Sequence, residues 1–358
     1  MSTDGPRGTN KIPGWVLGLL VCLVVIALGA TLWTISLKRS VDASQDFYRH
    51  AVVDQLSHSV VNKLDAHFTD ANGDLVADPP ADEKDQLDPP KLVFTYIPVP
   101  QDAENNPYPK AFIEFVQHLS QVTGKPAEYQ TYTSLNDELK AMRDGQLQVA
   151  GFNTGAVPMA VDACGFVPMW KLATARGEAS YRMQIIVPTD SDMRSVDDIR
   201  GHELTLTEPG SNSGYKAPLL LLRSVFQLEP GKDYVLRYSG GHDESIKGIA
   251  SKQYQCAAVA SDVLLRDTYK GDITQQQFRV LYDSEAFPTA CFGCAYNLKP
   301  PLAEKIRQAF ATFDWKSTGL EKEFANAGQS QFVPANYKDD WSLIRQIDNE
   351  TGVQHKID

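Results

Sequence analysis

In the middle of the chain, short extended runs alternate with longer segments in which apolar residues recur every three or four positions. Extended, largely apolar runs predict strands at 91–97 and 148–154, and a further strand is expected near 127–132. Between these runs, the spacing of apolar residues predicts helices at 109–122 and 135–143. Strands that alternate with helices form a parallel sheet with crossover helices, so we expect an α/β fold.

Two further extended runs, 183–188 and 286–296, enclose a second series of strands and helices. A chain that crosses twice between two such units predicts two lobes joined by paired linkers. We therefore expect lobe 1 at 91–185, lobe 2 at 186–287, and a return to lobe 1 with C-terminal helices at 288–358.

The first part of the chain contains an almost unbroken apolar run, Trp15–Ile35, without a charged residue. A run of this length can span a bilayer. No small-x-small cleavage site follows it, which disfavours the alternative of a removed signal peptide. We expect a cytoplasmic tail at 1–14 and an uncleaved transmembrane anchor at 15–36.

Residues 37–90 predict a stalk helix followed by an acidic, proline-rich linker. The stalk carries one apolar stripe at near-helical spacing over 40–68. Acidic and amide side chains alternate over 70–74 as in a calcium loop, but the glycine falls one place early and Ala81 stands where the loop needs a glutamate. A flexible charged linker is therefore favoured, and calcium binding by it is left open.

Composition and charge narrow the class of protein. The chain has 358 residues, of which 42% are hydrophobic and 22% charged, as in a globular protein with a sizeable core. The net charge of −11 argues against a nucleic-acid-binding protein, for which a basic stripe is expected. Outside the apolar run, Cys164, Cys256, Cys291 and Cys294 show no zinc spacing, so buried free thiols and a long-range pair with Cys164 both remain open.

The clearest candidate for chemistry is the loop TEPGSNSGYKAP at 207–218, which we call the anion loop. It follows a short predicted strand at 203–207 and precedes a leucine-rich predicted helix at 217–228. Small polar residues at the start of a helix collect unpaired N–H groups and the positive end of the helix dipole, which together bind tetrahedral oxyanions. Taken alone, the loop favours an ordinary capped helix over a binding site.

A second stretch with candidate donors follows the anion loop. Ser239-Gly-Gly-His242 begins another predicted helix, and a small-residue strand from Ala257 ends at Ser261-Asp262. Together with the anion loop, this set resembles the phosphate, phosphite and phosphonate substrate-binding proteins of ABC importers over residues 91–335. The resemblance implies a type II periplasmic binding protein whose lobes close on a ligand, an extracytoplasmic location, permease and ATPase subunits as partners, and no cofactor.

The resemblance also implies which residues bind the ligand. The family's loop, in which a threonine usually takes the place of the asparagine, corresponds to Ser211, Asn212, Ser213 and Gly214. His242 corresponds to a histidine that donates to the ligand, and Asp262 to a carboxylate that contacts it. Ala290 lies near the place of the acidic residue with which aminoalkylphosphonate binders hold the ligand amine. Phosphate, phosphite or a simple phosphonate is therefore favoured.

Residues at strand ends in lobe 1 complete the predicted site, because ligands in α/β sheets bind beyond the carboxyl ends of the strands. This rule selects Tyr96, Asn153 and Thr154. Phe152 stands where some members of the family have a tyrosine, so one hydroxyl donor is expected to be missing. For Asp262, the alternative to a ligand contact is a cap on the helix that follows it.

Two other functions would use the same residues. A hydrolase would take Ser211 or Ser213 as nucleophile, His242 as base and Asp262 as the orienting acid. The loop lacks the Gly-x-Ser-x-Gly spacing, however, and the chain order Ser, His, Asp fits none of the common triads. A membrane-tethered sensor would need a partner, because residues 1–14 hold no output domain. Capture of a phosphorus oxyanion for an importer is the function that the sequence favours.

Overall fold

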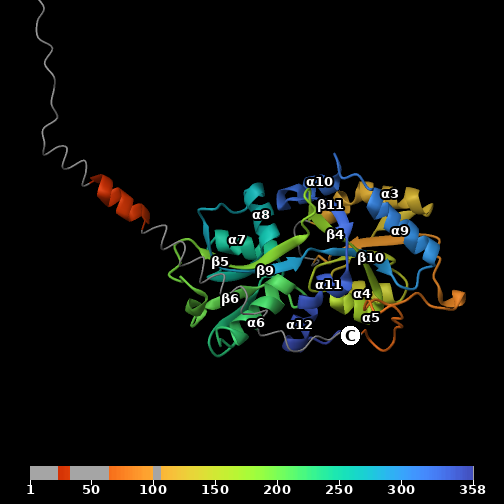
Figure 1. Ribbon diagram of the computed structural model, residues 1–358, viewed down its shortest axis with the longest axis horizontal. Coiled ribbons are helices and arrows are strands. Elements are labelled where there is room, and N and C mark those ends of the chain that lie inside the picture. Colours follow the sequence, from red (N-terminus) through yellow and green to blue (C-terminus); the bar gives the residue numbers. More distant parts are fainter. Residues whose placement is uncertain (1–22, 33–63, 100–105, 358) are drawn as a thin grey trace, which may run out of the picture. The chain divides into compact units, whose positions relative to one another are not determined.

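The computed structural model describes residues 23–32, 64–99 and 106–357. The chain divides into two units, Met1–Tyr48 and Arg49–Asp358. The second unit carries the fold drawn in Figure 1, and the two units are considered separately.

Residues 23–32 are the described part of the first unit and form a helix inside the predicted anchor at 15–36. Its large apolar side chains are between 55% and 67% exposed. No helix of the described stretches is long and apolar enough to cross a membrane. The predicted tail at 1–14, the two ends of the predicted anchor and the stalk up to residue 63 lie outside the described residues.

The acidic segment from residue 64 onward is part of the second unit and packs into its core, so the prediction of a flexible linker is wrong for this stretch. Leu75 and Ala77 are buried in the core. The carboxylate of Asp70 accepts hydrogen bonds from the N–H groups of Gly73, Asp74 and Leu75, which fixes a compact turn. A short 3₁₀-helix, η1 (Glu83–Asp85), follows this turn.

Lobe 1 is built on six strands: β1 (Leu92–Tyr96), β2 (Ala127–Tyr129), β3 (Val149–Phe152), β4 (Phe166–Thr174), β10 (Cys291–Ala295) and β11 (Gln329–Pro334). Their order in the sheet is β11-β4-β10-β3-β1-β2. β1 runs parallel to β2 and β3, as predicted. β10 lies antiparallel between β3 and β4, and β11 pairs antiparallel with β4, so the sheet is mixed rather than purely parallel.

The helices of lobe 1 are α2 (Tyr108–Ala111), α3 (Ile113–Thr123), α4 (Leu135–Arg143), α5 (Val157–Cys164), α9 (Pro300–Thr312), α10 (Gly319–Phe324), η4 (Ala325–Ala327), α11 (Tyr337–Asp340) and α12 (Ser342–Thr351). The predicted helix at 135–143 is α4, capped by Oγ of Ser134. The predicted helix at 109–122 is divided between α2 and α3, because the chain bends at Phe112, whose side chain is fully buried.

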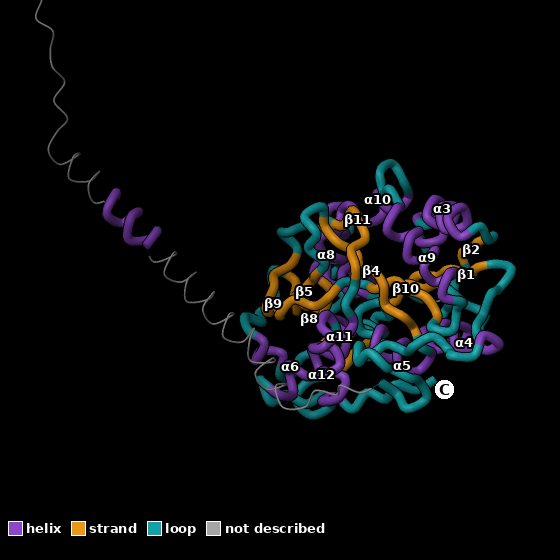
Figure 2. Tube along the Cα trace, turned by 45° about the vertical axis from the view of Figure 1, so that its right-hand side comes forward, coloured by secondary structure: helices purple, strands orange, loops and turns teal. Residues whose placement is uncertain are grey.

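Lobe 2 is built on β5 (Ser180–Pro188), β6 (Glu203–Leu206), β7 (Val235–Tyr238), β8 (Cys256–Ala260) and β9 (Phe278–Pro288), in the order β7-β6-β8-β5-β9. Its helices are η2 (Val196–Ile199), η3 (Asn212–Lys216), α6 (Ala217–Ser224), α7 (His242–Ala250) and α8 (Ser261–Lys270). β6 is parallel to β7 and β8, whereas β5 is antiparallel to β8 and β9. Figure 2 shows the strands of the two lobes as separate groups with helices around them.

The chain changes sheets twice, between β4 and β5 and again between β9 and β10. The first change falls at 175–179, ahead of the predicted boundary at 185/186, because all of β5 belongs to the sheet of lobe 2. The two crossings are tied together at Thr289, whose N–H donates to the carbonyl of Ala179 at 3.3 Å and whose Oγ1 donates to the carbonyl of Leu172 at 2.6 Å. Lobe 2 is therefore one continuous segment, and lobe 1 is formed from both sides of it.

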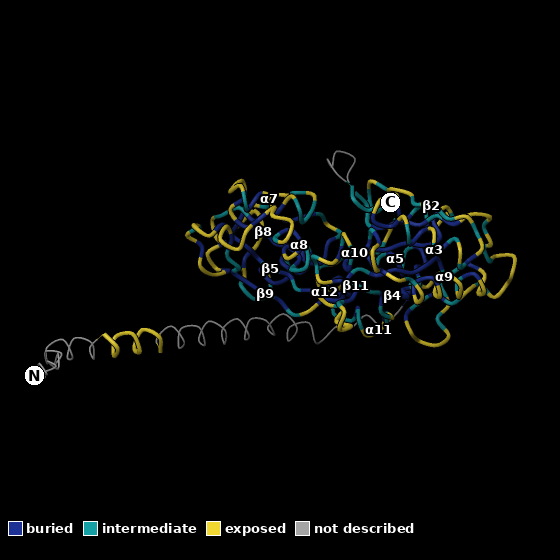
Figure 3. The backbone as a smooth tube through the Cα atoms, turned by 90° about the horizontal axis from the view of Figure 1, so that it is seen from above, coloured by how far each residue is buried: buried dark blue, intermediate teal, exposed yellow. Residues whose placement is uncertain are grey.

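Buried strands run through the interior of each lobe, as the dark blue tube in Figure 3 shows. In lobe 1 the ring of Tyr96 stacks on Phe292 with centroids 5.2 Å apart, and Phe112 packs against both. The cysteines at 164, 256, 291 and 294 are all buried free thiols. Of the two alternatives left open by the sequence, the structure has the free thiols, and the long-range disulfide is not formed.

Candidate ligand-binding site

The anion loop, between β6 and α6, holds three buried polar side chains, Ser211, Asn212 and Ser213, each at most 6% exposed. Ser211 caps the single π-helical turn η3, since its Oγ accepts a hydrogen bond from the N–H of Gly214 at 3.0 Å. Position 214 has no room for a side chain, because a Cβ there would lie 2.0 Å from Oγ1 of Thr207. The predicted helix start is thus a π turn, a form found often at functional sites.

His242 is the first residue of α7, and its ring lies against the anion loop. Nδ1 accepts a hydrogen bond from the N–H of Ala260 at 3.2 Å, so the neutral ring carries its proton on Nε2. Nε2 lies 3.4 Å from Oγ of Ser211 and 3.5 Å from Oγ of Ser213. Burial lowers the pKa of His242 to about 4, so the ring is an uncharged N–H donor at neutral pH.

Tyr181, near the start of β5, adds a buried hydroxyl that is not found from the sequence. Its oxygen lies 3.5 Å from Nδ2 of Asn212. Burial raises the pKa of Tyr181, and hydrogen bonds with Thr154, Asn212 and Ser213 oppose that rise. An aromatic residue in an extended run normally indicates core packing, so the sequence carries no signal for this role.

Two of the predicted site residues, Tyr96 and Phe152, are aromatic. Tyr96 ends β1 in contact with the aromatic core, and burial raises its pKa well above the usual value, with Tyr108 and Asp262 adding to the rise. Phe152 is fully buried and packs edge-on against Phe166, with ring centroids 4.8 Å apart. Both side chains are therefore buried in the apolar core, Tyr96 at 4% and Phe152 at 0% exposure.

The polar strand-end residues of lobe 1 are engaged in local hydrogen bonds. Oγ1 of Thr154 donates to the carbonyl of Pro288 at 2.6 Å, which links the end of β3 to the second crossing. Oδ1 of Asn153 accepts from the N–H of Ala156 at 2.9 Å. These bonds hold the start of α5 in place beside the anion loop.

Asp262 is half-buried in the first turn of α8. Its Oδ1 accepts from the N–H of Val263 at 3.0 Å, and its Oδ2 accepts from Nε2 of Gln329, in β11 of lobe 1, at 3.2 Å. Burial raises the pKa of Asp262. The carboxylate thus takes part in a hydrogen bond between the lobes. The alternative of a cap at Asp262 is wrong, because α8 already begins at Ser261, its N-cap residue is Ala260, and no side chain caps it.

A second polar group between the lobes, also missed from the sequence, centres on Arg266 one turn further along α8. The guanidinium is 6% exposed and donates to Asp243 and, at 3.0 Å, to Asp267. Its Nη1 lies 3.8 Å from Glu323 of α10, which also receives a bond from Lys270 at 3.2 Å. Charged residues on a predicted helix normally indicate a solvated face, so only the fold reveals this contact between lobes.

The arrangement differs from a Ser-His-Asp triad. In a triad the carboxylate accepts a hydrogen bond from Nδ1–H of the histidine. Here Nδ1 of His242 is itself an acceptor, and Asp262 bonds elsewhere. The ring therefore donates toward the two serine hydroxyls and is oriented as a binding group, not as the base that a serine nucleophile requires.

The structure has two lobes joined by a pair of crossings, which is the type II periplasmic-binding-protein fold. Neutral donors of lobe 2 gather where it meets lobe 1, as in a solute-binding protein. Residues 97–341 match the family of periplasmic substrate-binding proteins of phosphonate ABC transporters. The chain belongs to this family, whose members bind substrates for transport and are not enzymes.

Known relatives agree with this assignment. The chain is 24% identical over 285 residues to the phosphate-import protein PhnD of Mycolicibacterium smegmatis, covering 75% of this chain and 86% of the relative. A binding protein of an ABC phosphonate transporter from Pseudomonas aeruginosa has a similar structure, with a TM-score of 0.62, 22% identity and coverage of 74% and 87%. PhnD1 of Prochlorococcus marinus in complex with methylphosphonate also scores 0.62, at 15% identity and coverage of 74% and 99%.

We predict that His242 and His355 titrate on opposite sides of neutral pH. Burial alone would lower the pKa of His355, but hydrogen bonds to Asp162 and Asp348 outweigh it and raise the pKa to about 9. At pH 7, long-range ¹H–¹⁵N spectra should show His242 as the neutral Nε2–H tautomer and His355 doubly protonated. Because the folded-state pKa of His242 is depressed, its stabilising contribution is present above pH 6.5 and is lost as the pH falls toward 4.

A His242→Gln variant assigns the signal, since only that ring disappears from the spectrum. A ring at position 242 that titrates near pH 6.5, or that carries its proton on Nδ1, would contradict the arrangement described above.

Proposed function

We propose that the protein captures a phosphorus oxyanion outside the cytoplasm and delivers it to the permease and ATPase of an ABC importer. The observation that carries the proposal is the meeting of Nε2–H of His242 with the hydroxyls of Ser211 and Ser213, at 3.4 and 3.5 Å. These separations are long for direct hydrogen bonds, so an oxygen atom placed among the three groups would gain shorter ones. Three neutral donors at one point suit a tetrahedral anion in a protein whose net charge is −11.

The backbone around these side chains favours an anion as well. His242 stands at the N-terminal end of α7, where N–H groups are unpaired within the helix and the dipole favours negative charge. The anion-loop residues Ser211, Asn212, Ser213 and Gly214 form the opposite wall of the proposed site. Tyr96, Asn153 and Thr154 contribute from lobe 1, and Phe152 supports that wall from the core.

The ligands of the relatives support a phosphorus compound with a small substituent or none. The Mycolicibacterium relative is named for phosphate import, and the Prochlorococcus structure holds methylphosphonate. Position 290 carries an alanine, so this position offers no carboxylate for a ligand amine. Phosphate, phosphite and methylphosphonate are therefore the ligands to test first.

We further propose that residues 15–36 anchor the protein in the membrane with the lobes on the extracytoplasmic side. The support is the uncharged apolar run Trp15–Ile35 and the exposed apolar side chains of the helix at 23–32. We expect the mature protein to begin at its original N-terminus and to sediment with membranes after a high-salt wash. N-terminal sequencing that starts near Thr31 would show a cleaved signal peptide instead.

Loss of one donor should weaken ligand binding strongly. Ser213→Ala and His242→Ala each remove a hydrogen bond to a charged oxygen, which costs about 1.5–3 kcal/mol. This corresponds to about a 10-fold to 150-fold loss of affinity in calorimetric titrations with phosphate and methylphosphonate. Ser251→Ala, which removes an exposed hydroxyl at the far end of α7, is the matched control and should bind as the wild type does. Wild-type affinity in both site variants would place the ligand elsewhere.

The carboxylate at position 262 should select ligands that still carry a proton. An ionised aspartate only accepts hydrogen bonds, so it favours a P–OH group and repels sulfate, which has no proton to donate. We expect Asp262→Asn to bind phosphate less tightly and to discriminate less against sulfate. Gln329→Leu, which removes only the bond from lobe 1, is the control. If Asp262→Asn keeps both properties, the side chain has no ligand role and serves only the hydrogen bond with Gln329.

A further inference from the structure

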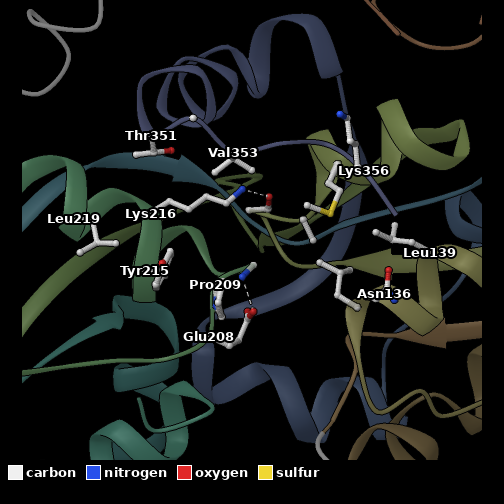
Figure 4. A pocket seen from close by; sticks show the side chains of 16 residues that line it. Asn136, Leu139, Glu208, Pro209, Tyr215, Lys216, Leu219, Thr351, Val353 and Lys356 are labelled. Atoms are coloured by element: carbon white, nitrogen blue, oxygen red, sulfur yellow. Dashed lines mark hydrogen bonds between the residues drawn. The ribbon is translucent and has the colours of Figure 1, made fainter. Parts of the chain in front are cut away.

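A buried lysine joins the anion loop to lobe 1. Lys216 is the last residue of η3, and its side chain is 2% exposed. Its backbone N–H donates to the carbonyl of Ser211 at 3.1 Å, so its position and that of the anion loop are coupled. Its Nζ donates to the carbonyl of Gly155, in lobe 1, at 2.8 Å and to Oδ1 of Asp348 at 2.6 Å. Figure 4 shows the lysine extended toward this carbonyl, with its bond dashed.

Lys216 begins a chain of alternating charges. Oδ2 of Asp348 is bonded to Nε2 of His355 at 3.0 Å, and Nδ1 of His355 is bonded to Asp162 in α5. The hydrogen bonds to the two carboxylates keep the pKa of His355 at about 9 despite its burial, so the ring is charged at neutral pH. The cations Lys216 and His355 therefore alternate with the anions Asp348 and Asp162. Their mutual attraction offsets the free-energy cost of burying the charges of Lys216 and Asp348.

The C-terminal segment carries this chain from one lobe to the other. Just before α12, Nε1 of Trp341 donates to the carbonyl of Thr154 in lobe 1 at 3.0 Å. α12 then packs against η3 and α6 of lobe 2, where Asp348 meets Lys216. Beyond α12, His355 returns to Asp162 of lobe 1. The segment 341–355 thus contacts both lobes on one side of the proposed ligand site.

The lobes also touch at the backbone beside Lys216. A Cβ added at Gly155 would lie 2.4 Å from the carbonyl oxygen of Gly210 and 2.5 Å from the nitrogen of Asn212. Any side chain at position 155 would therefore push the anion loop away from lobe 1. Only a glycine permits this approach.

Next to this contact the interface is hollow. A cavity of about 530 Å³ is lined by residues of both lobes, among them Leu139 and Met159 from lobe 1 and Glu208 and Leu219 from lobe 2 (Figure 4). Gly155 and Gly210, which both line the cavity, are the place where its two walls come close to each other. The bonds of Lys216 and the close contact at Gly155 therefore hold the lobes together on this side.

We infer that Lys216 is a positioning residue for ligand capture: it fixes the anion loop to Gly155 and to the segment 341–355 when the lobes are closed. It is not a ligand contact, because its ammonium is already bonded to Gly155 and Asp348. The inference rests on the proposed function for its binding readout. Loss of the ammonium should make the open arrangement more populated and lower the affinity for every ligand by one common factor.

The test compares full-length wild type with Lys216→Met, which keeps the length of the side chain, and with the double variant Lys216→Met/Asp348→Asn. The double variant leaves no uncompensated carboxylate if the single variant folds poorly. Lys356→Met is the matched control, because this lysine lines the same cavity but is exposed. Phosphate and methylphosphonate are titrated by calorimetry, dissociation rates are followed by stopped flow, and small-angle scattering reports compaction.

We expect the double variant to lose affinity about tenfold for both ligands, with faster dissociation and a larger radius of gyration without ligand. Gly155→Ala should reproduce the pattern, and Lys356→Met should match the wild type. Unchanged affinity and unchanged scattering in a folded double variant would overturn the inference. If the wild type binds neither ligand, the proposed function fails, and the scattering of the ligand-free variants still decides whether Lys216 holds the lobes together.

Discussion

The hydrogen bond from the N–H of Ala260 to Nδ1 of His242 determines which nitrogen of the ring can donate, and the candidate site is arranged around that choice. An anion that leaves water must exchange its hydration shell for donors already in place. With Nδ1 occupied, a neutral ring presents Nε2–H toward Ser211 and Ser213 without adding a charge. The same bond joins the end of β8 to the start of α7, so the sheet of lobe 2 holds the ring in position.

Contacts between the lobes lie in two groups of opposite character. On one side, α8 presents Asp262 and Arg266 to Gln329 and Glu323 through bonds that reach the edge of lobe 1. On the other side, Lys216 forms an ion pair with Asp348, and both side chains are fully buried. Buried ion pairs contribute little net stability compared with apolar packing, but they tolerate only a narrow range of geometries. Such a pair therefore suits a contact that must form in one arrangement of the lobes.

Much of the fold and part of the site could be predicted from the sequence, for local physical reasons. α4 has a capping serine and a clear helical period, and the central parallel strands β1 and β3 are largely apolar. The loop at 211–214 and His242 are recognisable only in combination, because small polar residues at a helix start are usually ordinary caps and it is the set of two such helix starts that resembles the family. Tyr181, Arg266 and Lys216 could not be found in this way, because their partners lie in distant segments and their residue types usually indicate core or surface. The packing of residues 64–90 was hidden by their acidic composition.

The insertion of β10 between β3 and β4 has a consequence for how the chain folds. The sheet of lobe 2 is complete once residue 288 is present, and all its pairings are made within one continuous segment. The sheet of lobe 1 stays divided until residues 291–295 arrive, because β3 and β4 have no direct pairing. Contacts between distant segments form late, since a long loop must first be closed. During synthesis, the sheet of lobe 2 is therefore the first that can be completed. Until β10 is made, one edge of β3 and the whole of β4 have no strand partner, because β4 pairs only with β10 and β11.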